Sequence, residues 1–260
     1  MTDDMNSNMY GYNDYQGPSS YFAPTSNLTN NLQEESSDEE DDHNPLIAGM
    51  WMEGDSLAPP CGASIPSIHS ILSLAQITSS DVLYDLGCGD GRICLEAFFA
   101  SSTTNQSYSK CHSCVGVEIE QDLVLRFQSL IQKSFLYEHQ RKIPNIKSRS
   151  IQAKQKDLCT ILNKLVQLYA QPNSTNNQQD TDSTENLPRP TVITLYLLPE
   201  SIALIQPQLI ALMQHNKDLR IVCNTWGLKG LLPTKSTEYM EQNESATISL
   251  YTHDSIRDLS

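Results

Sequence analysis

The sequence predicts an α/β fold in which a mostly parallel sheet is covered by helices on both faces. Three observations lead to this prediction. Strand-like and helix-like apolar segments alternate along most of the chain. Two segments, 191–198 and 219–223, are almost continuously apolar, as strands buried on both faces are. A glycine-rich turn follows the first strand, where open α/β sheets place their ligands.

The predicted strands are short apolar runs bounded by polar or glycine-containing turns. They comprise 82–86, 114–119, 149–153, 191–198 and 219–223, of which 149–153 is the weakest. Near the end of the chain, 237–240 and 247–252 can form a closing hairpin, which adds one antiparallel edge to the sheet.

The predicted helices show apolar residues three and four positions apart, which is the period of a helix with one buried face. In the first of them Ile68, Ile71 and Leu72 have this spacing. The helices comprise 65–76, 93–99, 122–137, 158–169 and 200–214. Because they alternate with the strands, parallel pairing through crossover helices is expected.

The chain divides into an acidic tail and one domain. Residues 1–45 contain ten Asp and Glu and no Lys or Arg, and they are rich in Asn and Ser. Such a segment buries too little apolar surface to fold, so we predict a disordered tail. Residues 46–260 form the predicted domain, with disordered insertions near 101–113 and 170–190, where long polar stretches lack any periodicity.

Charge and composition exclude several classes of function. The 260-residue chain has a formal net charge of −14, and its first Lys or Arg is Arg92. A nucleic-acid partner is unexpected because that affinity comes from cations meeting phosphates. No apolar run reaches the ~18 residues of a membrane span. The N-terminus resembles neither a secretory signal nor a transit peptide, and the seven cysteines are an odd number, so we expect a cytoplasmic or nuclear protein with reduced thiols.

The turn after the first strand carries the chemistry. The strand reaches Asp85, and Gly87, Gly89 and Gly91 follow before a helix opens. Glycines there allow positive φ and close approach of a ligand to the backbone. A dinucleotide fingerprint would have its third glycine one position later, where this chain has Arg92. The Asp85 carboxylate would also repel a pyrophosphate, whereas it suits an ammonium group, so the turn favours S-adenosylmethionine (SAM) over NAD.

A second carboxylate is expected at the end of the next strand, where it can bind ribose hydroxyls. Glu118 ends the run 115–118. The long gap between the glycine turn and Glu118 is explained by the polar insertion at 101–113, and without it the distance from Asp85 is the usual one of about 20 residues. The alternative is that Glu118 is an ordinary surface acid.

The runs 85–93, 116–119, 156–158 and 194–199 resemble a group of class I SAM-dependent methyltransferases. That group includes bacterial proteins and the eukaryotic lysine methyltransferases of the mitochondrial ATP-synthase c-subunit and the adenine nucleotide translocase. The resemblance implies a Rossmann-like class I methyltransferase sheet. The acidic tail replaces the basic N-terminus of the mitochondrial members, which favours a non-mitochondrial location.

The resemblance also extends the set of cofactor residues. It implies that Asp157 contacts the adenine amino group and that Ser64 lies near the ligand, although either residue could instead cap a helix. The predicted cofactor-binding residues are Ser64, Asp85, Gly87, Gly89, Asp90, Glu118 and Asp157.

The acceptor is predicted to be a lysine side chain of a protein. Methyl transfer needs alignment of the two reactants rather than a covalent nucleophile or a metal. Methylases of exocyclic base nitrogens carry Asn/Asp-Pro-Pro-Tyr/Phe after the fourth strand, whereas residues 197–200 read Leu-Leu-Pro-Glu. An apolar channel would favour the neutral amine of lysine. Its candidate lining, and hence the catalytic set, is Tyr196, Glu200 and Trp226.

The sequence is also compatible with other interpretations. Glu200 could be an acid favoured by the dipole of the following helix, and Trp226 could belong to the core. The chain could methylate RNA or a small molecule, or it could be a non-catalytic interaction protein that keeps the fold. Cys111 and Cys114 form a single C-x-x-C pair without a partner pair at ligand spacing, so no metal is predicted.

Overall fold

The computed structural model describes residues 62–99, 108–140, 149–170, 187–241 and 244–259. All of them belong to the second of two units, which runs from Leu57 to Ser260. The predicted tail at 1–45 lies outside the described residues, as do most of the predicted insertions at 101–113 and 170–190.

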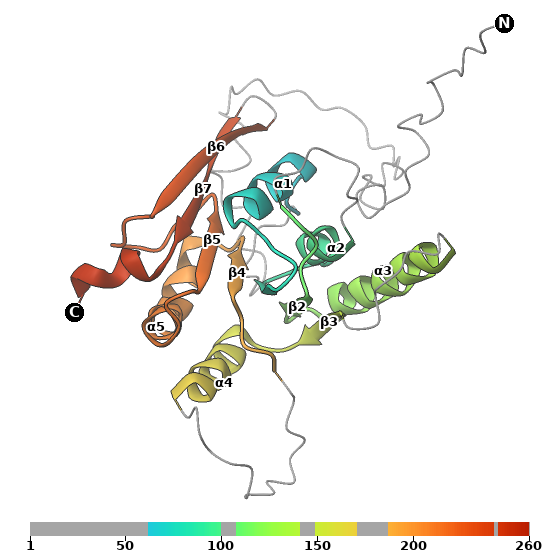
Figure 1. Ribbon diagram of the computed structural model, residues 1–260, viewed down its shortest axis with the longest axis horizontal. Coiled ribbons are helices and arrows are strands. Elements are labelled where there is room, and N and C mark those ends of the chain that lie inside the picture. Colours follow the sequence, from blue (N-terminus) through green and yellow to red (C-terminus); the bar gives the residue numbers. More distant parts are fainter. Residues whose placement is uncertain (1–61, 100–107, 141–148, 171–186, 242–243, 260) are drawn as a thin grey trace, which may run out of the picture. The chain divides into compact units, whose positions relative to one another are not determined.

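The described residues form one seven-stranded sheet with the order β3-β2-β1-β4-β5-β7-β6 (Figure 1). The strands β1 to β5 are parallel, while β7 pairs antiparallel with both β5 and β6. The fold class predicted from the sequence is therefore confirmed, with the closing hairpin forming the antiparallel edge. The strands are β1 (Val82–Leu86), β2 (Ser113–Glu118), β3 (Ser150–Gln155), β4 (Val192–Leu195), β5 (Arg220–Asn224), β6 (Lys235–Glu241) and β7 (Glu244–Tyr251).

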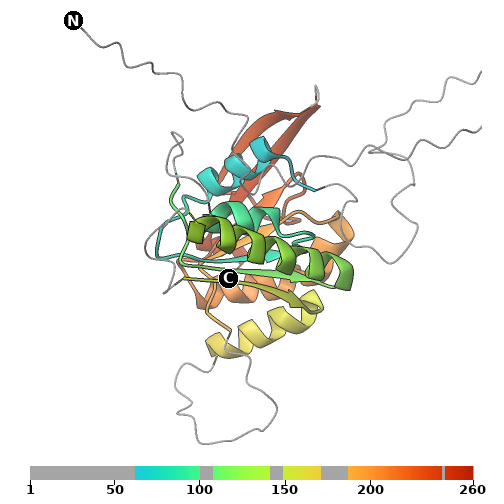
Figure 2. The same cartoon turned by 90° about the vertical axis from the view of Figure 1, so that its right-hand side faces the viewer.

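Helices cover both faces of this sheet. Figure 2 shows α1, α2 and α3 on one side of the sheet and α4 and α5 on the other. This arrangement buries the parallel strands on both faces, which explains their continuous apolar runs. The helices are α1 (Ile65–Leu74), α2 (Arg92–Phe99), α3 (Gln121–Gln140), α4 (Leu158–Ala170) and α5 (Pro199–His215), followed after β7 by the 3₁₀ segment η3 (His253–Leu259).

The fourth strand is shorter than its apolar run predicts. The prediction was a strand over 191–198, but β4 ends at Leu195. Leu195 pairs with Leu86, the last residue of β1, and with Cys223, the next-to-last residue of β5, so β4 ends where its neighbours also end or continue for one residue. Helix α5 then begins at Pro199, whose fixed φ suits the first turn of a helix. Tyr196, Leu197 and Leu198 therefore connect the carboxyl end of β4 to α5.

The two faces of β1 carry different kinds of side chain. Tyr84 and Leu86 belong to the core cluster that includes Ile205 and Leu209 of α5. Since side chains alternate along a strand, Asp85 points to the opposite face, which α1 and α2 cover. The strand therefore anchors the core with one face and places a carboxylate under α1 and α2 with the other.

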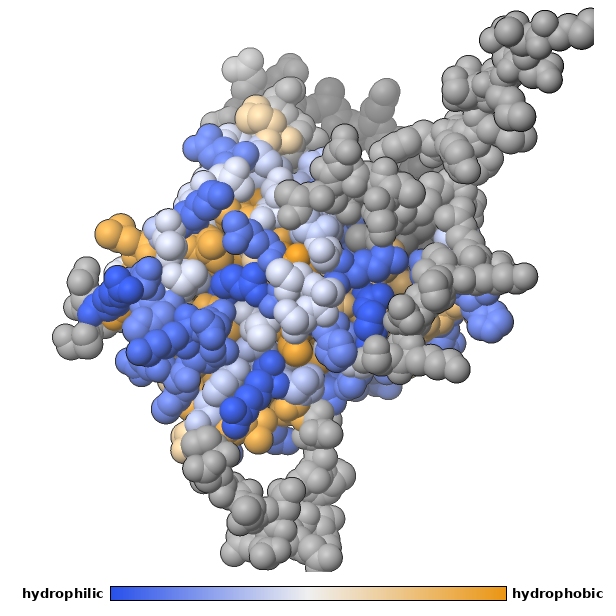
Figure 3. Space-filling model, in the orientation of Figure 1, coloured by the Kyte–Doolittle hydropathy of each residue, from blue (hydrophilic) through white to orange (hydrophobic). Residues whose placement is uncertain are grey.

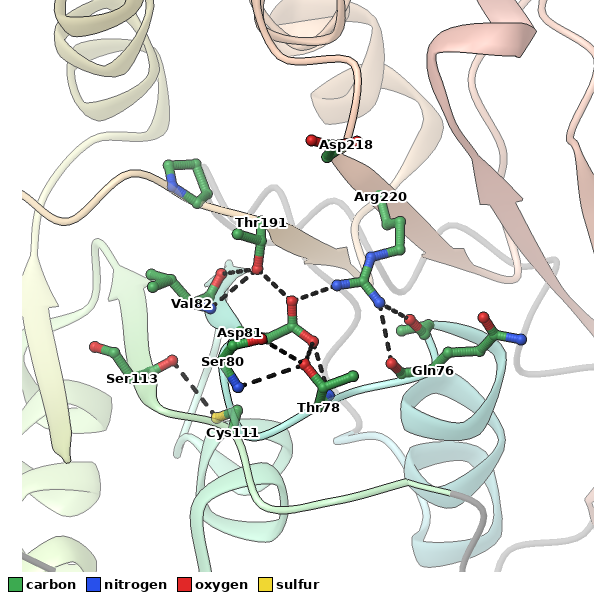
Figure 4. Close-up of polar contacts among 12 residues, drawn as sticks. Gln76, Thr78, Ser80, Asp81, Val82, Cys111, Ser113, Thr191, Asp218 and Arg220 are labelled. Carbon is green, nitrogen blue, oxygen red and sulfur yellow. Dashed lines mark hydrogen bonds and ion pairs between the residues drawn. The ribbon is translucent and has the colours of Figure 1, made fainter.

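Figure 4 shows a polar network around Asp81, which directly precedes β1. This network lies at the amino ends of the parallel strands, opposite to the carboxyl end that carries Asp85. The Asp81 carboxylate forms an ion pair with Arg220 at the start of β5. It also accepts hydrogen bonds from the Thr191 hydroxyl (2.6 Å) and from the backbone N–H and hydroxyl of Thr78 (2.7 and 2.9 Å). Arg220 in addition donates to the Gln76 carbonyl (3.0 Å), so the network joins the end of α1 to three strand starts.

Apolar side chains are scattered over the described surface. The face drawn in Figure 3 shows small apolar areas separated by hydrophilic ones. Within the described part of the chain, no helix is both long and apolar enough to span a membrane.

Candidate functional site

The glycine turn between β1 and α2 has the backbone geometry that the sequence predicts. Gly87 has φ +74° and Gly89 has φ +55°, a region that side chains disfavour. A Cβ at Gly87 would overlap the Leu197 side chain, so this position is closed from the β4 side. A Cβ at Gly89 would meet no atom of the described residues within 4 Å. The turn is therefore packed at its start and open beside Gly89.

Asp85 lies at the carboxyl end of β1 with a side chain that is almost completely buried. Only 2% of the residue is exposed. Among the described residues, one hydroxyl donates to its carboxylate, that of Thr194 on β4 (2.8 Å), and no cation pairs with it. Burial raises the pKa of Asp85 from its ordinary 3.8 to about 7, and the negative charges of Glu118 and Asp90 add to this effect. The carboxylate is thus a group that a bound cation would stabilise.

Glu118 at the end of β2 holds the glycine turn in place. Its carboxylate accepts the backbone N–H groups of Gly89 (2.9 Å), Ile119 (2.7 Å) and Glu120 (3.1 Å). A carboxylate has about four lone-pair sites, so capacity for one further donor remains. Glu118 therefore combines a structural role with the ability to accept a hydroxyl from a ligand.

Asp90 is engaged by arginine. Arg92 donates to both of its oxygens, each at 3.1 Å, and Arg126 lies 3.6 Å from the second oxygen. Arg92 also donates to the Ala63 carbonyl (3.1 Å), which ties the segment before α1 to the glycine turn. The cofactor role of Asp90 stays a prediction, while its visible contacts position the turn.

Ser64 and Asp157 both cap helices. The Ser64 hydroxyl accepts the Ser67 N–H at the start of α1 (3.4 Å). The exposed Asp157 carboxylate accepts the Thr160 N–H at the start of α4 (2.8 Å). A cap does not exclude contact with a ligand, since both residues lie near the site: Ser64 adjoins the segment tied to Arg92, and Asp157 follows the carboxyl end of β3. Their cofactor roles therefore stay predictions.

Two of the three predicted acceptor-site residues lie together. The rings of Tyr196 and Trp226 stack, with centroids 6.3 Å apart and planes inclined by 19°. Tyr196 directly follows β4, and Trp226 lies two residues after β5, so the pair stands beyond the carboxyl ends of neighbouring strands. Trp226 is half-buried and also packs against the core, as the alternative interpretation of this residue expects, and the acceptor roles of Tyr196 and Trp226 stay predictions.

Glu200 has different surroundings from the aromatic pair. It is exposed in the first turn of α5, where the helix dipole favours an acid. Among the described residues no hydrogen bond or ion pair of its side chain is present, and its acceptor role stays a prediction.

Two polar residues of this region were not predicted as site residues. Thr194 supplies the hydroxyl on Asp85, and the fully buried Asn224 at the end of β5 bonds to Ser67 and Tyr239. The only sequence signal was a polar residue in or beside an otherwise apolar run. That signal is hard to use without knowing which strands are neighbours.

The C-x-x-C pair lies within the protein interior. Cys111 and Cys114 are both buried, with their sulfur atoms 2.8 Å apart. Burial raises the pKa of Cys114 well above its ordinary value, which keeps the thiol protonated and poorly reactive. In the part of the chain that the structure covers, no three His, Cys, Asp or Glu side chains are grouped so that they could hold a metal ion.

Several solved structures similar to this chain are methyltransferases. An RNA methyltransferase from Salinibacter ruber in complex with S-adenosyl-L-homocysteine is 22% identical, with 74% of this chain and 93% of that chain covered and a TM-score of 0.47. The tRNA methyltransferase TrmK of Bacillus subtilis is 15% identical, with 73% of this chain and 68% of that chain covered and a TM-score of 0.41. The C-terminal domain of a precorrin-6Y C5,15-methyltransferase from Rhodobacter capsulatus is 12% identical, with 75% of this chain and 93% of that chain covered and a TM-score of 0.39.

No protein-family model matches the sequence, and no curated protein matches it. The predicted resemblance to the lysine-methyltransferase group thus stays a prediction. Because these three structural similarities are distant, the function is inferred from the residues of this chain.

Proposed function

We propose that this chain is a SAM-dependent methyltransferase. The observation that carries the proposal is the buried Asp85 carboxylate, which has one hydroxyl partner and no cation among the described residues. Burying a charge without a partner is costly. A ligand that brings an ammonium group to the carboxyl end of β1 would remove this cost, and SAM carries such a group.

The other residues of the site suit the remaining parts of SAM. Glu118 is held by three backbone N–H groups and can accept a ribose hydroxyl. The space beside Gly89 lets a ligand approach the backbone of the turn. Ile119 follows Glu118 and is 61% exposed, which offers apolar surface to a base. When bound, SAM would supply a methyl group activated by its sulfonium.

The acceptor in this proposal is a lysine side chain of a protein. A lysine amine must lose its proton before it can attack, and its ordinary pKa is about 10.4. Tyr196 and Trp226 together offer an apolar aromatic surface beside the site, which disfavours the charged form and excludes water. The exposed carboxylate of Glu200 would attract the lysine while it is still charged.

RNA is the second acceptor class to be tested, because two of the similar structures are an RNA and a tRNA methyltransferase. Charge favours protein over RNA. The described residues include 14 Lys and Arg and 16 Asp and Glu, and the whole chain has a net charge of −14. A surface without cationic excess gains little from phosphate neutralisation.

The test has two steps. Calorimetric titration with SAM and with S-adenosylhomocysteine should show binding of both, and lack of binding would refute the cofactor assignment. The protein is then incubated with methyl-labelled SAM and separated protein, RNA and metabolite fractions of a cell extract. We expect protease-sensitive, nuclease-resistant label, identified by mass spectrometry as methyl-lysine. Label confined to RNA or to metabolites would refute the lysine acceptor and leave the methyltransferase assignment intact.

A further inference from the structure

The backbone just after β5 is strained. Thr225 has φ +68°, an unfavourable value for a residue branched at Cβ. The Trp226 N–H donates to the Asn224 carbonyl (2.8 Å), so Thr225 is the central residue of a three-residue γ-turn with positive φ, a rare and strained type. Such strain persists only where surrounding contacts impose it, and it is concentrated at functional sites.

Contacts from β7 hold one side of this turn. The Thr225 N–H donates to the Thr247 carbonyl (2.9 Å), and the Leu228 N–H donates to the Tyr251 hydroxyl (3.1 Å). Gly227 lies so close to the same hydroxyl that a Cβ would overlap it. Residues 225–228, which we call the Thr225 turn, are therefore fixed against β7.

The side chain of Asn224 fixes the turn from its other end. Asn224 is fully buried. Its amide nitrogen donates to the Ser67 hydroxyl of α1 (3.1 Å), and its amide oxygen accepts from the Tyr239 hydroxyl of β6 (3.2 Å). One amide therefore joins α1, β5 and β6 directly before the strained residue. A buried amide is costly unless it is bonded in this way.

The Thr225 turn presents Trp226 to Tyr196. The two rings stack beyond the ends of β5 and β4. On the other side of β4, the adjoining Leu197 lies against Gly87, the first residue of the glycine turn. The aromatic pair therefore stands beside the proposed methyl-donor site and not elsewhere on the molecule.

We infer that Asn224 is a positioning residue for the acceptor: its two hydrogen bonds keep the Thr225 turn in place, so that Trp226 and Tyr196 form a rigid wall for the acceptor side chain. The inference rests on the proposed function for the identity of the acceptor. A preorganised wall lowers the entropy lost when the acceptor binds. Loss of Asn224 should therefore weaken acceptor binding while leaving the cofactor end of the site unchanged.

The experiment uses the full chain with Trp51→Phe, so that Trp226 is the only indole. In this background we compare Asn224→Leu, Tyr239→Phe and a control, Ser236→Ala. Ser236 lies on the same strand as Tyr239 and bonds only to Ser249 across the exposed hairpin (3.2 Å) among the contacts that the structure records for its side chain. The measurements are Trp226 emission and acrylamide quenching, affinity for S-adenosylhomocysteine, and methylation rate against dilution of the protein fraction that accepts label.

We expect Asn224→Leu to change Trp226 quenching and to raise the half-saturating amount of acceptor about tenfold, with a smaller rise of about threefold for Tyr239→Phe, the weaker perturbation. Affinity for S-adenosylhomocysteine should change less than twofold, and Ser236→Ala should behave as the parent. Unchanged Trp226 quenching in Asn224→Leu would overturn the inference. A parallel loss of cofactor affinity would also overturn it, because Asn224 would then act on the whole site.

Failure of the proposed function has a different signature. In that case the parent protein itself would not bind S-adenosylhomocysteine, whatever the indole reports. An unchanged half-saturating amount of acceptor in a variant with altered Trp226 quenching would show that the turn is rigid for stability alone.

Discussion

Asp81 and Asp85 lie four residues apart, at the two ends of β1, and both are almost fully buried. Their surroundings are opposite. Asp81 accepts from Thr78 and Thr191 and pairs with Arg220, so its charge is compensated within the protein. Asp85 has only the Thr194 hydroxyl among the described residues, and its pKa is raised to about 7. A carboxylate satisfied by its own chain holds the fold, whereas an unsatisfied one is available for a ligand.

The largest expected effect is on stability, at Asp81, whose charge is compensated within the protein. Asp81→Ala leaves Arg220 without its anion and removes three further hydrogen bonds, so the free energy of unfolding should fall by about 3 kcal/mol. Urea denaturation followed by circular dichroism measures this. Asp254→Ala removes an exposed ion pair with Arg257 and should change stability by less than about 0.5 kcal/mol. Loss of cofactor affinity without loss of stability in Asp81→Ala would contradict the comparison.

At Asp85, near the carboxyl end of β1, a substitution should act mainly on cofactor binding. Asp85→Asn removes the carboxylate proposed to face the ammonium group, and affinity for S-adenosylhomocysteine should fall about 100-fold, since bonds to charged groups contribute up to about 3 kcal/mol. Stability at pH 8 should rise by about 2 kcal/mol, because a buried charge is removed. Calorimetry and urea denaturation give the two values. A variant that binds as tightly as the parent would rule out this carboxylate as the ammonium partner.

The surroundings of Asp85 could be predicted from the sequence better than those of Asp81. Glycines, a preceding acid and an apolar strand are local signals, and Asp85, Gly89 and Glu118 all lie at the carboxyl edge of the sheet as expected. Asp81 was not singled out, because Thr191 and Arg220 are more than 100 residues away along the chain. A partner at that distance is known only once the strand order is known.

The same limit explains what was missed within the site. Thr194 meets Asp85 because β4 pairs with β1 in a register that places them side by side. Asn224 meets Ser67 only because α1 packs over β5. The apolar run after Thr191 predicted a longer strand, since hydrophobicity alone does not reveal where the neighbouring strands end.

The pH dependence of binding sharpens the comparison. A bound ammonium group favours the ionised form of Asp85, whereas the free protein holds a proton there below its pKa of about 7. Affinity for S-adenosylhomocysteine should therefore fall as the pH is lowered through 7, by about 30-fold between pH 8 and 5.5. Asp85→Asn should remove most of this dependence. A profile that is flat in both proteins would show that Asp85 does not titrate in this range.

The same shift gives a sign for stability in the absence of ligand. Because the folded-state pKa of Asp85 is raised above its ordinary 3.8, the folded protein binds more protons than the unfolded chain between pH 3.8 and about 7. The contribution of Asp85 to the free energy of unfolding therefore decreases as the pH rises through this window. Subtracting the stability profile of Asp85→Asn from that of the parent isolates this contribution.

Two threonines offer a matched pair of smaller changes. Thr194→Val removes the donor on Asp85, which should raise its pKa further, move the midpoint of the binding profile to higher pH and lower affinity about fivefold. Thr191→Val removes a donor on Asp81 and should lower the free energy of unfolding by about 1 kcal/mol without a change in affinity. If Thr194→Val lowered only stability and Thr191→Val lowered only affinity, Asp81 and not Asp85 would be the carboxylate that faces the ligand.

The smallest expected effects concern Asp157, which combines a cap with a proposed contact to adenine. Asp157→Ala should lower the free energy of unfolding by about 1 kcal/mol, because the Thr160 N–H at the start of α4 loses its acceptor. Asn caps helices as well as Asp does, so Asp157→Asn should restore stability. If the carboxylate also contacts the ligand, both variants should bind S-adenosylhomocysteine about threefold more weakly. Parent-like affinity in both variants, with stability lost only in Asp157→Ala, would assign Asp157 to the helix alone and reduce the cofactor contacts at this edge to those of Asp85, Glu118 and the glycine turn.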